Sequence, residues 1–195
     1  MRYDERAFDV FMYPLERVAL AKRRRRLLPQ ASGVVLEIGA GTGANLPFYN
    51  WPHVSALHLL DLSITEAVRS FSPPNGTEVV RTEGRAESLP FDDATFDAVV
   101  FTLVFCSVDE PDRGLAEVRR VLKPGGRLFF IEHVRPSRRP RMAGFVDAVN
   151  PLWHSLSGEC NINRDTVRLI RNAGFTLETL SRGGAGLLAS GTARA

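Results

Sequence analysis

Ten residues decide the fold: Val34-Val35-Leu36-Glu37-Ile38 runs directly into Gly39-Ala40-Gly41-Thr42-Gly43. A short apolar run that ends in glycines is typical of a buried parallel strand followed by a tight loop. Glycine permits positive φ and lets a ligand approach the backbone, so this loop predicts a nucleotide-type cofactor. The spacing Gly-x-Gly-x-Gly differs from the Gly-x-Gly-x-x-Gly of dinucleotide-binding loops and lacks the Gly-Lys-Ser/Thr of a P-loop. A tight turn without a ligand is the alternative.

Six further apolar runs follow. We expect strands at residues 56–60, 77–81, 97–101, 128–132, 175–180 and 187–192, and helices at 43–50, 64–70, 111–122 and 164–173. Strands that alternate with helices form a parallel sheet with right-handed crossovers. The Arg182-Gly183-Gly184 turn joins the last two strands as an antiparallel hairpin. The fold class is therefore α/β: a Rossmann-like, doubly wound, mostly parallel seven-stranded sheet with an antiparallel C-terminal hairpin strand.

The chain has 195 residues, 44% of them hydrophobic and 24% charged, which suits a single globular domain. Residues 1–30 carry eight basic and four acidic side chains, so the rest of the chain sums to −1. A charge confined to one segment argues against a nucleic-acid binder. We expect an N-terminal helical extension or cap at 1–30, with helix over 5–28 interrupted at Pro14, and one domain over 31–195.

No secretory signal or membrane span is visible, because no apolar run approaches the ~20 residues of a spanning helix. We expect a cytoplasmic protein with reduced cysteines. The basic run Lys22–Arg26 is interpreted as a solvated helix end, where cations favour the dipole; weak peripheral contact with an anionic membrane is the alternative. Two cysteines do not suffice for a zinc site and no metal constellation is apparent, so we expect no metal.

Asp61 ends the second predicted strand. A carboxylate at this place can accept hydrogen bonds from both ribose hydroxyls of an adenosine ligand. The alternative role is an N-cap for the next helix. Ser63 suits that cap better, which leaves Asp61 for the ligand.

Residues 135–162 do not fit the alternation of strands and helices and are interpreted as an insertion after the fifth strand. In a doubly wound sheet such an insertion leaves from the carboxyl edge, where ligands bind. We therefore expect it to cover the substrate.

Five motifs occur in a fixed order along the chain: Glu37-x-Gly-x-Gly-x-Gly, Asp61-Leu62-Ser63, Ala86-Glu87-Ser88-Leu89-Pro90-Phe91, Phe96-Asp97 and Leu122-Lys123-Pro124-Gly125-Gly126. Over roughly residues 30–180 they resemble the class I S-adenosylmethionine-dependent methyltransferases, and most of all the small ubiquinone- and menaquinone-biosynthesis type. The resemblance implies S-adenosylmethionine as cofactor, with S-adenosylhomocysteine as product. It also implies cofactor-binding roles for a set of residues: Glu37, Gly39, Ala40, Gly41, Thr42, Gly43, Asn45, Asp61, Leu62, Ala86, Glu87, Thr102 and Leu103.

A narrower set of motifs comprises Thr102-Leu103-Val104-Phe105-Cys106-Ser107-Val108, Phe130-Ile131-Glu132-His133-Val134, Asn150-Pro151-Leu152-Trp153, Cys160-Asn161 and Arg164-Asp165. It resembles the methyltransferase-like 7 group, whose characterised animal members methylate small-molecule thiols and carry a hydrophobic N-terminal anchor that we do not expect here. The resemblance implies S-methylation of a small thiol.

Other functions stay open beside this one. Within the family they are carbon or oxygen methylation of a quinone or phenol and nitrogen methylation of a lipid. Outside it they are an NAD-dependent oxidoreductase, which the glycine spacing disfavours, and an inactive protein that binds S-adenosylmethionine, which the intact glycine loop and Asp61 disfavour.

Methyl transfer from a sulfonium mainly requires that the nucleophile be aligned and desolvated. A free thiol, with a pKa of about 8.5, is already a few per cent ionised at pH 7, so it needs little help from a base. His133 is the candidate catalytic base or electrostatic group; a structural histidine is the alternative. The candidate substrate residues, with packing as the alternative for each, are Phe105, Cys106, Phe145, Trp153 and His154.

Overall fold

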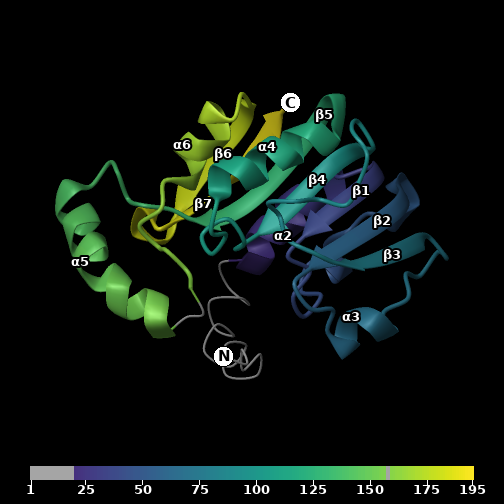
Figure 1. The fold of residues 1–195 in the computed structure, drawn as a ribbon, viewed down its shortest axis with the longest axis horizontal. Coiled ribbons are helices and arrows are strands. Elements are labelled where there is room, and N and C mark those ends of the chain that lie inside the picture. The colour runs from purple at the N-terminus through teal and green to yellow at the C-terminus, as the bar shows by residue number, and fades with distance from the viewer. Residues whose placement is uncertain (1–19, 157–158) are drawn as a thin grey trace.

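A computed structural model describes residues 20–156 and 159–195, which form one α/β sheet flanked by helices (Figure 1). The strands lie in the order β3-β2-β1-β4-β5-β7-β6. Neighbours from β3 to β5 are parallel, and β7 runs antiparallel to both β5 and β6. The predicted fold class is confirmed, including the C-terminal hairpin. The strand bounds are β1 Gly33–Ile38, β2 Val54–Asp61, β3 Glu78–Glu83, β4 Phe96–Thr102, β5 Leu122–His133, β6 Thr176–Gly183 and β7 Leu188–Arg194.

Within the described ranges, one α-helix precedes β1, and the others lie between the strands. The α-helices are α2 Ala21–Leu27, α3 Glu66–Ser70, α4 Pro111–Val121, α5 Pro140–Leu156 and α6 Thr166–Asn172. The 3-10 turns are η2 Leu28–Gln30, η3 Leu46–Phe48, η4 Trp51–His53 and η5 Gly184–Gly186.

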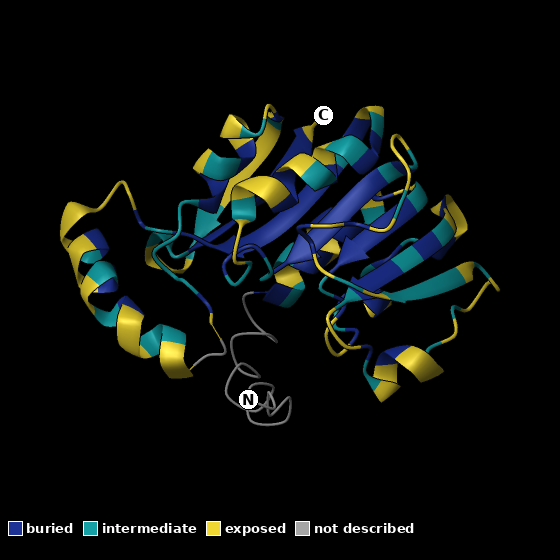
Figure 2. Ribbon diagram, viewed as in Figure 1, coloured by how far each residue is buried: buried dark blue, intermediate teal, exposed yellow. Residues whose placement is uncertain are grey.

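The central strands are mostly apolar because both of their faces are covered. In β4, Val99 and Phe101 enter one core cluster, while Ala98 and Val100 enter the other. Successive strand side chains point to opposite faces, so every residue of a central strand needs an apolar partner. Figure 2 shows the resulting buried centre of the sheet, with exposed residues on the outer faces of the helices.

Each core cluster joins the sheet to its own helices. Leu115 of α4 and Ile170 of α6 pack in the first cluster, and Leu27 of α2 and Val68 of α3 pack in the second. The predicted helix over 5–28 is confirmed in the part that α2 occupies, and residues 1–19 lie outside the described residues. The rigid sheet therefore has one layer on each face, and its carboxyl edge remains for loops.

Three local predictions are wrong. Residues 43–50 form no α-helix but the turn η3, because Pro47 lacks an N–H and Pro52 disfavours helical backbone before it. Strand β5 begins at Leu122, earlier than expected, and its first residues pair with β4 through a register irregularity. The cap of α3 is Thr65, whose hydroxyl accepts the N–H of Val68, and not Ser63.

The insertion 135–162 contains α5, a 17-residue helix that the sequence pattern did not reveal. Figure 1 shows α5 standing apart from the sheet, beyond the end of β5. A partly exposed ion pair of 2.6 Å joins Asp147 of α5 to Arg135 in the segment before the helix. Within the described part of the chain, no helix is long and apolar enough to cross a membrane.

Candidate functional site

The glycine loop after β1 has the backbone that glycine alone adopts easily. Gly39, Gly41 and Gly43 have φ values of 74°, 51° and 81°. A Cβ added at Gly39 would overlap the side chain of Val104, whereas one added at Gly41 would meet no heavy atom within 4 Å. The loop is therefore packed closely at Gly39 and open at Gly41, as a ligand-facing loop requires.

Asp61 stands beside that open space. It ends β2, which pairs in parallel with β1, so both strands deliver their last residues to the same edge. Its Oδ2 accepts the N–H of Gly41 at 2.8 Å. The side chain of Leu62 next to it is 67% exposed. A carboxylate and an exposed apolar side chain thus flank the glycine loop.

A buried polar network supports the loop from below. Glu37 is 1% exposed, and its carboxylate accepts hydrogen bonds from Asn45 at 3.0 Å and Tyr49 at 2.5 Å. Asn45 also accepts from the guanidinium of Arg24 at 2.6 Å and bonds Thr102 at 3.2 Å. This network ties α2, β1 and the end of β4 together.

The network shifts the ionisation of its members. Burial raises the pKa of Glu37 to about 7, against the hydrogen bonds of Tyr49 and Asn45 and the charge of Arg24. Burial lowers the pKa of Arg24 to about 10. Arg24 was expected on a solvated helix end; it is instead buried, donates to Asn45, and interacts electrostatically with Glu37. A buried carboxylate needs such partners. That need is also the signal that could have pointed to Tyr49, which the sequence analysis missed.

The residues predicted beside adenine lie beyond β3. Ala86 is part of the core, and Glu87 is 7% exposed. The carboxylate of Glu87 accepts from the guanidinium of Arg85 and from the N–H of Asp109, both at 3.2 Å. The side chain of Glu87 is therefore engaged in holding this loop.

The loop after β4 is strained at Leu103, which has a φ of 57° although it is not glycine. Such a conformation costs of order 1–3 kcal/mol and persists where the surroundings impose it. Here the surroundings are the carboxylate of Glu132, which accepts the N–H groups of Val104, Phe105 and Cys106 at 2.8, 3.1 and 3.0 Å. Glu132 is fully buried, and burial raises its pKa to about 7.

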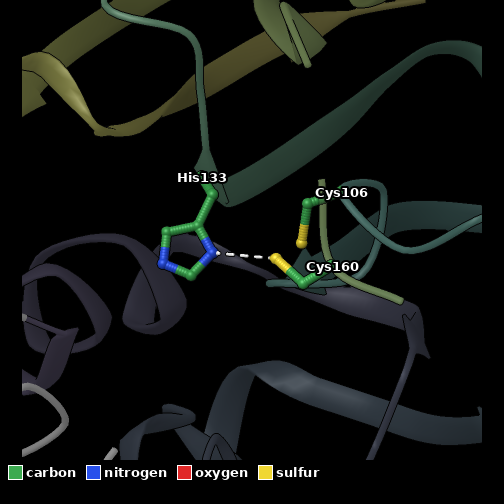
Figure 3. A group of neighbouring side chains, drawn as sticks. All are labelled: Cys106, His133 and Cys160. Carbon is green, nitrogen blue, oxygen red and sulfur yellow. Dashed lines mark hydrogen bonds between the residues drawn. The ribbon is translucent and has the colours of Figure 1, made fainter. Parts of the chain in front are cut away.

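Cys106, His133 and Cys160 meet at this edge, and we call them the Cys–His cluster (Figure 3). Their ligand atoms lie within 4.8 Å of one another, and all three residues are buried. His133 is the last residue of β5, and its Nδ1 lies 3.4 Å from Sγ of Cys160. The sequence did not reveal the cluster because its members are far apart in the chain, with 27 positions from Cys106 to His133 and another 27 from His133 to Cys160.

The pKa values of the two cysteine thiols are shifted in opposite directions. The hydrogen bond from Cys106 lowers the pKa of Cys160, and His133 and Trp153 lower it further, against the effect of burial. The same hydrogen bond and burial raise the pKa of Cys106. Cys160 is therefore the more acidic of the two thiols.

A backbone clamp holds the two cysteine loops together. The carbonyl of Cys106 accepts the main-chain N–H of Asn161 at 2.8 Å and its side-chain amide at 3.2 Å. The guanidinium of Arg164 donates to the carbonyls of Phe105 and Val108, both at 2.6 Å. Glu132, Asn161 and Arg164 had no role assigned from the sequence, since each acts on backbone atoms distant in the chain.

The remaining candidate substrate residues lie in two different places, the core of the sheet and helix α5. Phe105 is fully buried, with its ring centroid 4.4 Å from that of Phe101, so it belongs to the core beneath the cluster. Phe145, Trp153 and His154 lie on α5, where Phe145 is 63% exposed. Of these three, Trp153 is the one with an interaction with the cluster, through Cys160.

Comparison with known proteins finds methyltransferases with similar sequences. A model described as methyltransferase domain matches residues 36–130. Human thiol S-methyltransferase TMT1B is 32% identical over 171 residues, covering 80% of this chain and 69% of that protein. The rat protein of that name is 34% identical, and the chain spans 59% of its length.

Relatives with other names match as well. Phosphatidylethanolamine N-methyltransferase of Cereibacter sphaeroides is 30% identical over 75% of this chain and 76% of its own length. Demethylmenaquinone methyltransferase of Renibacterium salmoninarum is 34% identical over 61% of this chain and 51% of its own length. The fold matches an S-adenosylmethionine-dependent methyltransferase structure from Mesorhizobium loti with a TM-score of 0.69, at 17% identity and 94% and 97% coverage.

Proposed function

Because the chain belongs to the family of S-adenosylmethionine-dependent methyltransferases, we propose that it methylates the sulfur of a small-molecule thiol. The observation that carries this proposal is the position of the His133–Cys160 pair, at the same sheet edge as the glycine loop. Val104 joins the two places, since it packs on Gly39 and lies two residues before Cys106. The identity with a thiol S-methyltransferase supports the choice of acceptor.

The residues around the glycine loop, from Glu37 to Asn45 together with Asp61, form what we call the cofactor half of the edge. They fit S-adenosylmethionine. The open space at Gly41 can receive the methionine part along the backbone of residues 39–43, and Asp61 beside it can accept the ribose hydroxyls. Leu62 would pack on adenine, with Ala86 and Glu87 near its amino group. Glu37 and Asn45 keep the loop in place, and Thr102 and Leu103 border it.

The cofactor supplies an electrophilic methyl group: the acceptor sulfur forms a bond to its carbon while the sulfonium C–S bond breaks, and S-adenosylhomocysteine leaves. The chain's own residues have to align the acceptor and take charge of its proton. Cys160 and the imidazole of His133 are the polar groups at the acceptor edge that can do so. We propose that the insertion 135–162 covers the acceptor, with Trp153 and His154 on its inner side and Phe145 at its rim.

A panel of acceptors tests the function. We expect S-adenosylhomocysteine release with small thiols and none with their S-methyl ethers, which differ only in the sulfur that is blocked. His133→Ala lowers turnover with thiols, and His53→Asn, at an exposed histidine of η4, leaves it unchanged. Turnover of a quinol or phenol without turnover of any thiol would reject the S-methylation proposal.

A lipid amine is the second candidate, and α5 favours it. Its residues Phe145, Leu152 and Leu156 are 63%, 66% and 77% exposed and recur at helical spacing. Exposed arginines 138, 139 and 141 precede them, and an apolar helix face beside basic groups is typical of binding at a lipid surface. Vesicles of phosphatidylethanolamine belong in the same panel, and methylation of that lipid at a higher rate than any thiol would make it the function.

A further inference from the structure

The Cys–His cluster has a composition that catalytic zinc sites use. It offers two sulfurs and one imidazole nitrogen, the Cys2His set, in which three protein ligands leave the fourth tetrahedral position open. Among residues 20–156 and 159–195, no fourth His, Cys, Asp or Glu completes the group. These are also the only cysteines of the chain.

One ligand pair already has the spacing of a metal site, and all three ligand atoms lie within 4.8 Å of one another. Tetrahedral zinc with a Zn–S bond of about 2.3 Å and a Zn–N bond of about 2.0 Å places those two ligand atoms roughly 3.5 Å apart. Sγ of Cys160 and Nδ1 of His133 are separated by 3.4 Å. Figure 3 shows both sulfurs and the imidazole pointing toward one another from three different segments.

The surroundings hold these ligands in position. Glu132 fixes the N–H of Cys106, and Asn161 fixes its carbonyl, so the two cysteine loops are clamped before any ion binds. The side chain of Trp153 interacts with the sulfur of Cys160. In metalloproteins, groups that contact the metal-binding residues orient them and raise the affinity for the metal.

We propose that Cys106, His133 and Cys160 bind a Zn²⁺ ion whose open fourth position receives the acceptor thiol as a thiolate. The acceptor part rests on the proposed thiol methylation; the metal site does not. With the ion bound, His133 and Cys160 act as ligands and no longer as the proton acceptor. A thiol that binds zinc loses its proton to solvent and keeps its electron pair on sulfur. The ion would thus supply the nucleophile at neutral pH, and it would also tie the end of the insertion to the last residue of β5.

The site is tested with Co²⁺, whose absorption reports thiolate ligands and tetrahedral geometry without any turnover. Tag-free protein is reduced with a phosphine, freed of metal with a chelator and titrated with Co²⁺, then with Zn²⁺. We expect one Co²⁺ per chain, sulfur-to-metal charge-transfer bands, and loss of those bands when Zn²⁺ displaces Co²⁺. Absence of saturable uptake would overturn the proposal.

Variants locate the ion. Cys106→Ser, Cys160→Ser and His133→Ala each weaken Co²⁺ binding by at least about 100-fold, because loss of a ligand should exceed the 10- to 100-fold cost of losing a partner that only orients one. His53→Asn, outside the cluster, leaves it unchanged. Affinity for S-adenosylmethionine, measured on every variant, shows that the cofactor half is still folded. Uptake that survives in the Cys106→Ser/Cys160→Ser double variant would place the metal elsewhere and reject the site.

The acceptor position has its own readout. Adding a thiol to the Co²⁺ protein without S-adenosylmethionine strengthens the charge-transfer bands, because a third sulfur joins the ion, and the S-methyl ether of that thiol does not. An unchanged spectrum would remove the acceptor from the metal. If Co²⁺ binds as described but no thiol is methylated by the Zn²⁺-loaded enzyme, the proposed function fails and the metal site stands.

Discussion

The half of this edge that we propose for the cofactor and the half that we propose for the acceptor are built in different ways. In the cofactor half, the decisive residues are consecutive: strand β1, the glycine loop and Glu37 come from one stretch, and Asp61 ends the neighbouring strand. In the acceptor half, Cys106, His133 and Cys160 come from three segments joined by Glu132, Asn161 and Arg164. A shared ligand needs the first arrangement to be rigid, whereas different acceptors need the second to vary.

The largest expected effect tests that rigidity. Gly39→Ala puts a Cβ at a φ of 74° and against Val104, and strain and overlap together should cost about 3 kcal/mol or more of the free energy of unfolding. Gly76→Ala is the matched control, because it has the same φ of 74° with nothing within 4 Å. We expect it to cost about 1 kcal/mol, in the range for a left-handed residue. Equal losses in denaturant unfolding would show that contact with Val104 does not couple the halves.

The next effect comes from the buried carboxyl of the cofactor half. The pKa of Glu37 is about 7 in the folded chain and 4.5 in the reference state. Between these values the unfolded chain releases the proton while the folded chain keeps it, so stability falls as pH rises from 4.5 to 7. The shift corresponds to about 3 kcal/mol.

Glu37→Gln removes this titration and keeps the shape. The free energy of unfolding of the variant, relative to that of the wild type, should rise steadily from pH 4.5 to pH 7. Denaturant unfolding of both proteins at several pH values measures this difference. A difference that stays constant with pH would mean that Glu37 is ionised in the folded protein throughout, as a charge paired with Arg24.

A smaller effect separates the ligand contact from the fold. Asp61→Ala should weaken binding of S-adenosylmethionine by about 10- to 100-fold, as expected for loss of hydrogen bonds to a charged group. Glu83→Ala is the control, since Glu83 is the carboxylate that ends the adjacent strand β3. Calorimetry that finds the same affinity for Asp61→Ala and Glu83→Ala would remove Asp61 from the ribose.

The same contrast explains what could be read from the sequence. The strands, the glycine loop and the place of Asp61 follow from local rules: apolar runs, glycine at positive φ and the shared edge of parallel strands. The roles of Arg24, Tyr49 and Glu132 were not predicted, because their hydrogen-bond partners are set by tertiary contacts and not by spacing in the sequence. The Cys–His cluster was not predicted for the same reason. Helix α5 was not predicted because Gly144 and Pro151 interrupt its helical sequence pattern.

The smallest expected effect concerns α5, and it sharpens the comparison most. Phe145 and Leu152 are exposed, so Phe145→Ser/Leu152→Ser should change the free energy of unfolding by no more than about 0.5 kcal/mol. Val146→Ser, a buried position of the same helix, should cost about 2 kcal/mol or more and serves as the contrast. Affinity for S-adenosylmethionine should stay within about twofold in the double variant, because these side chains belong to the acceptor half. A clear loss of that affinity in calorimetry would mean that the exposed face of α5 reaches the cofactor, and the two halves would then have to be treated as one site.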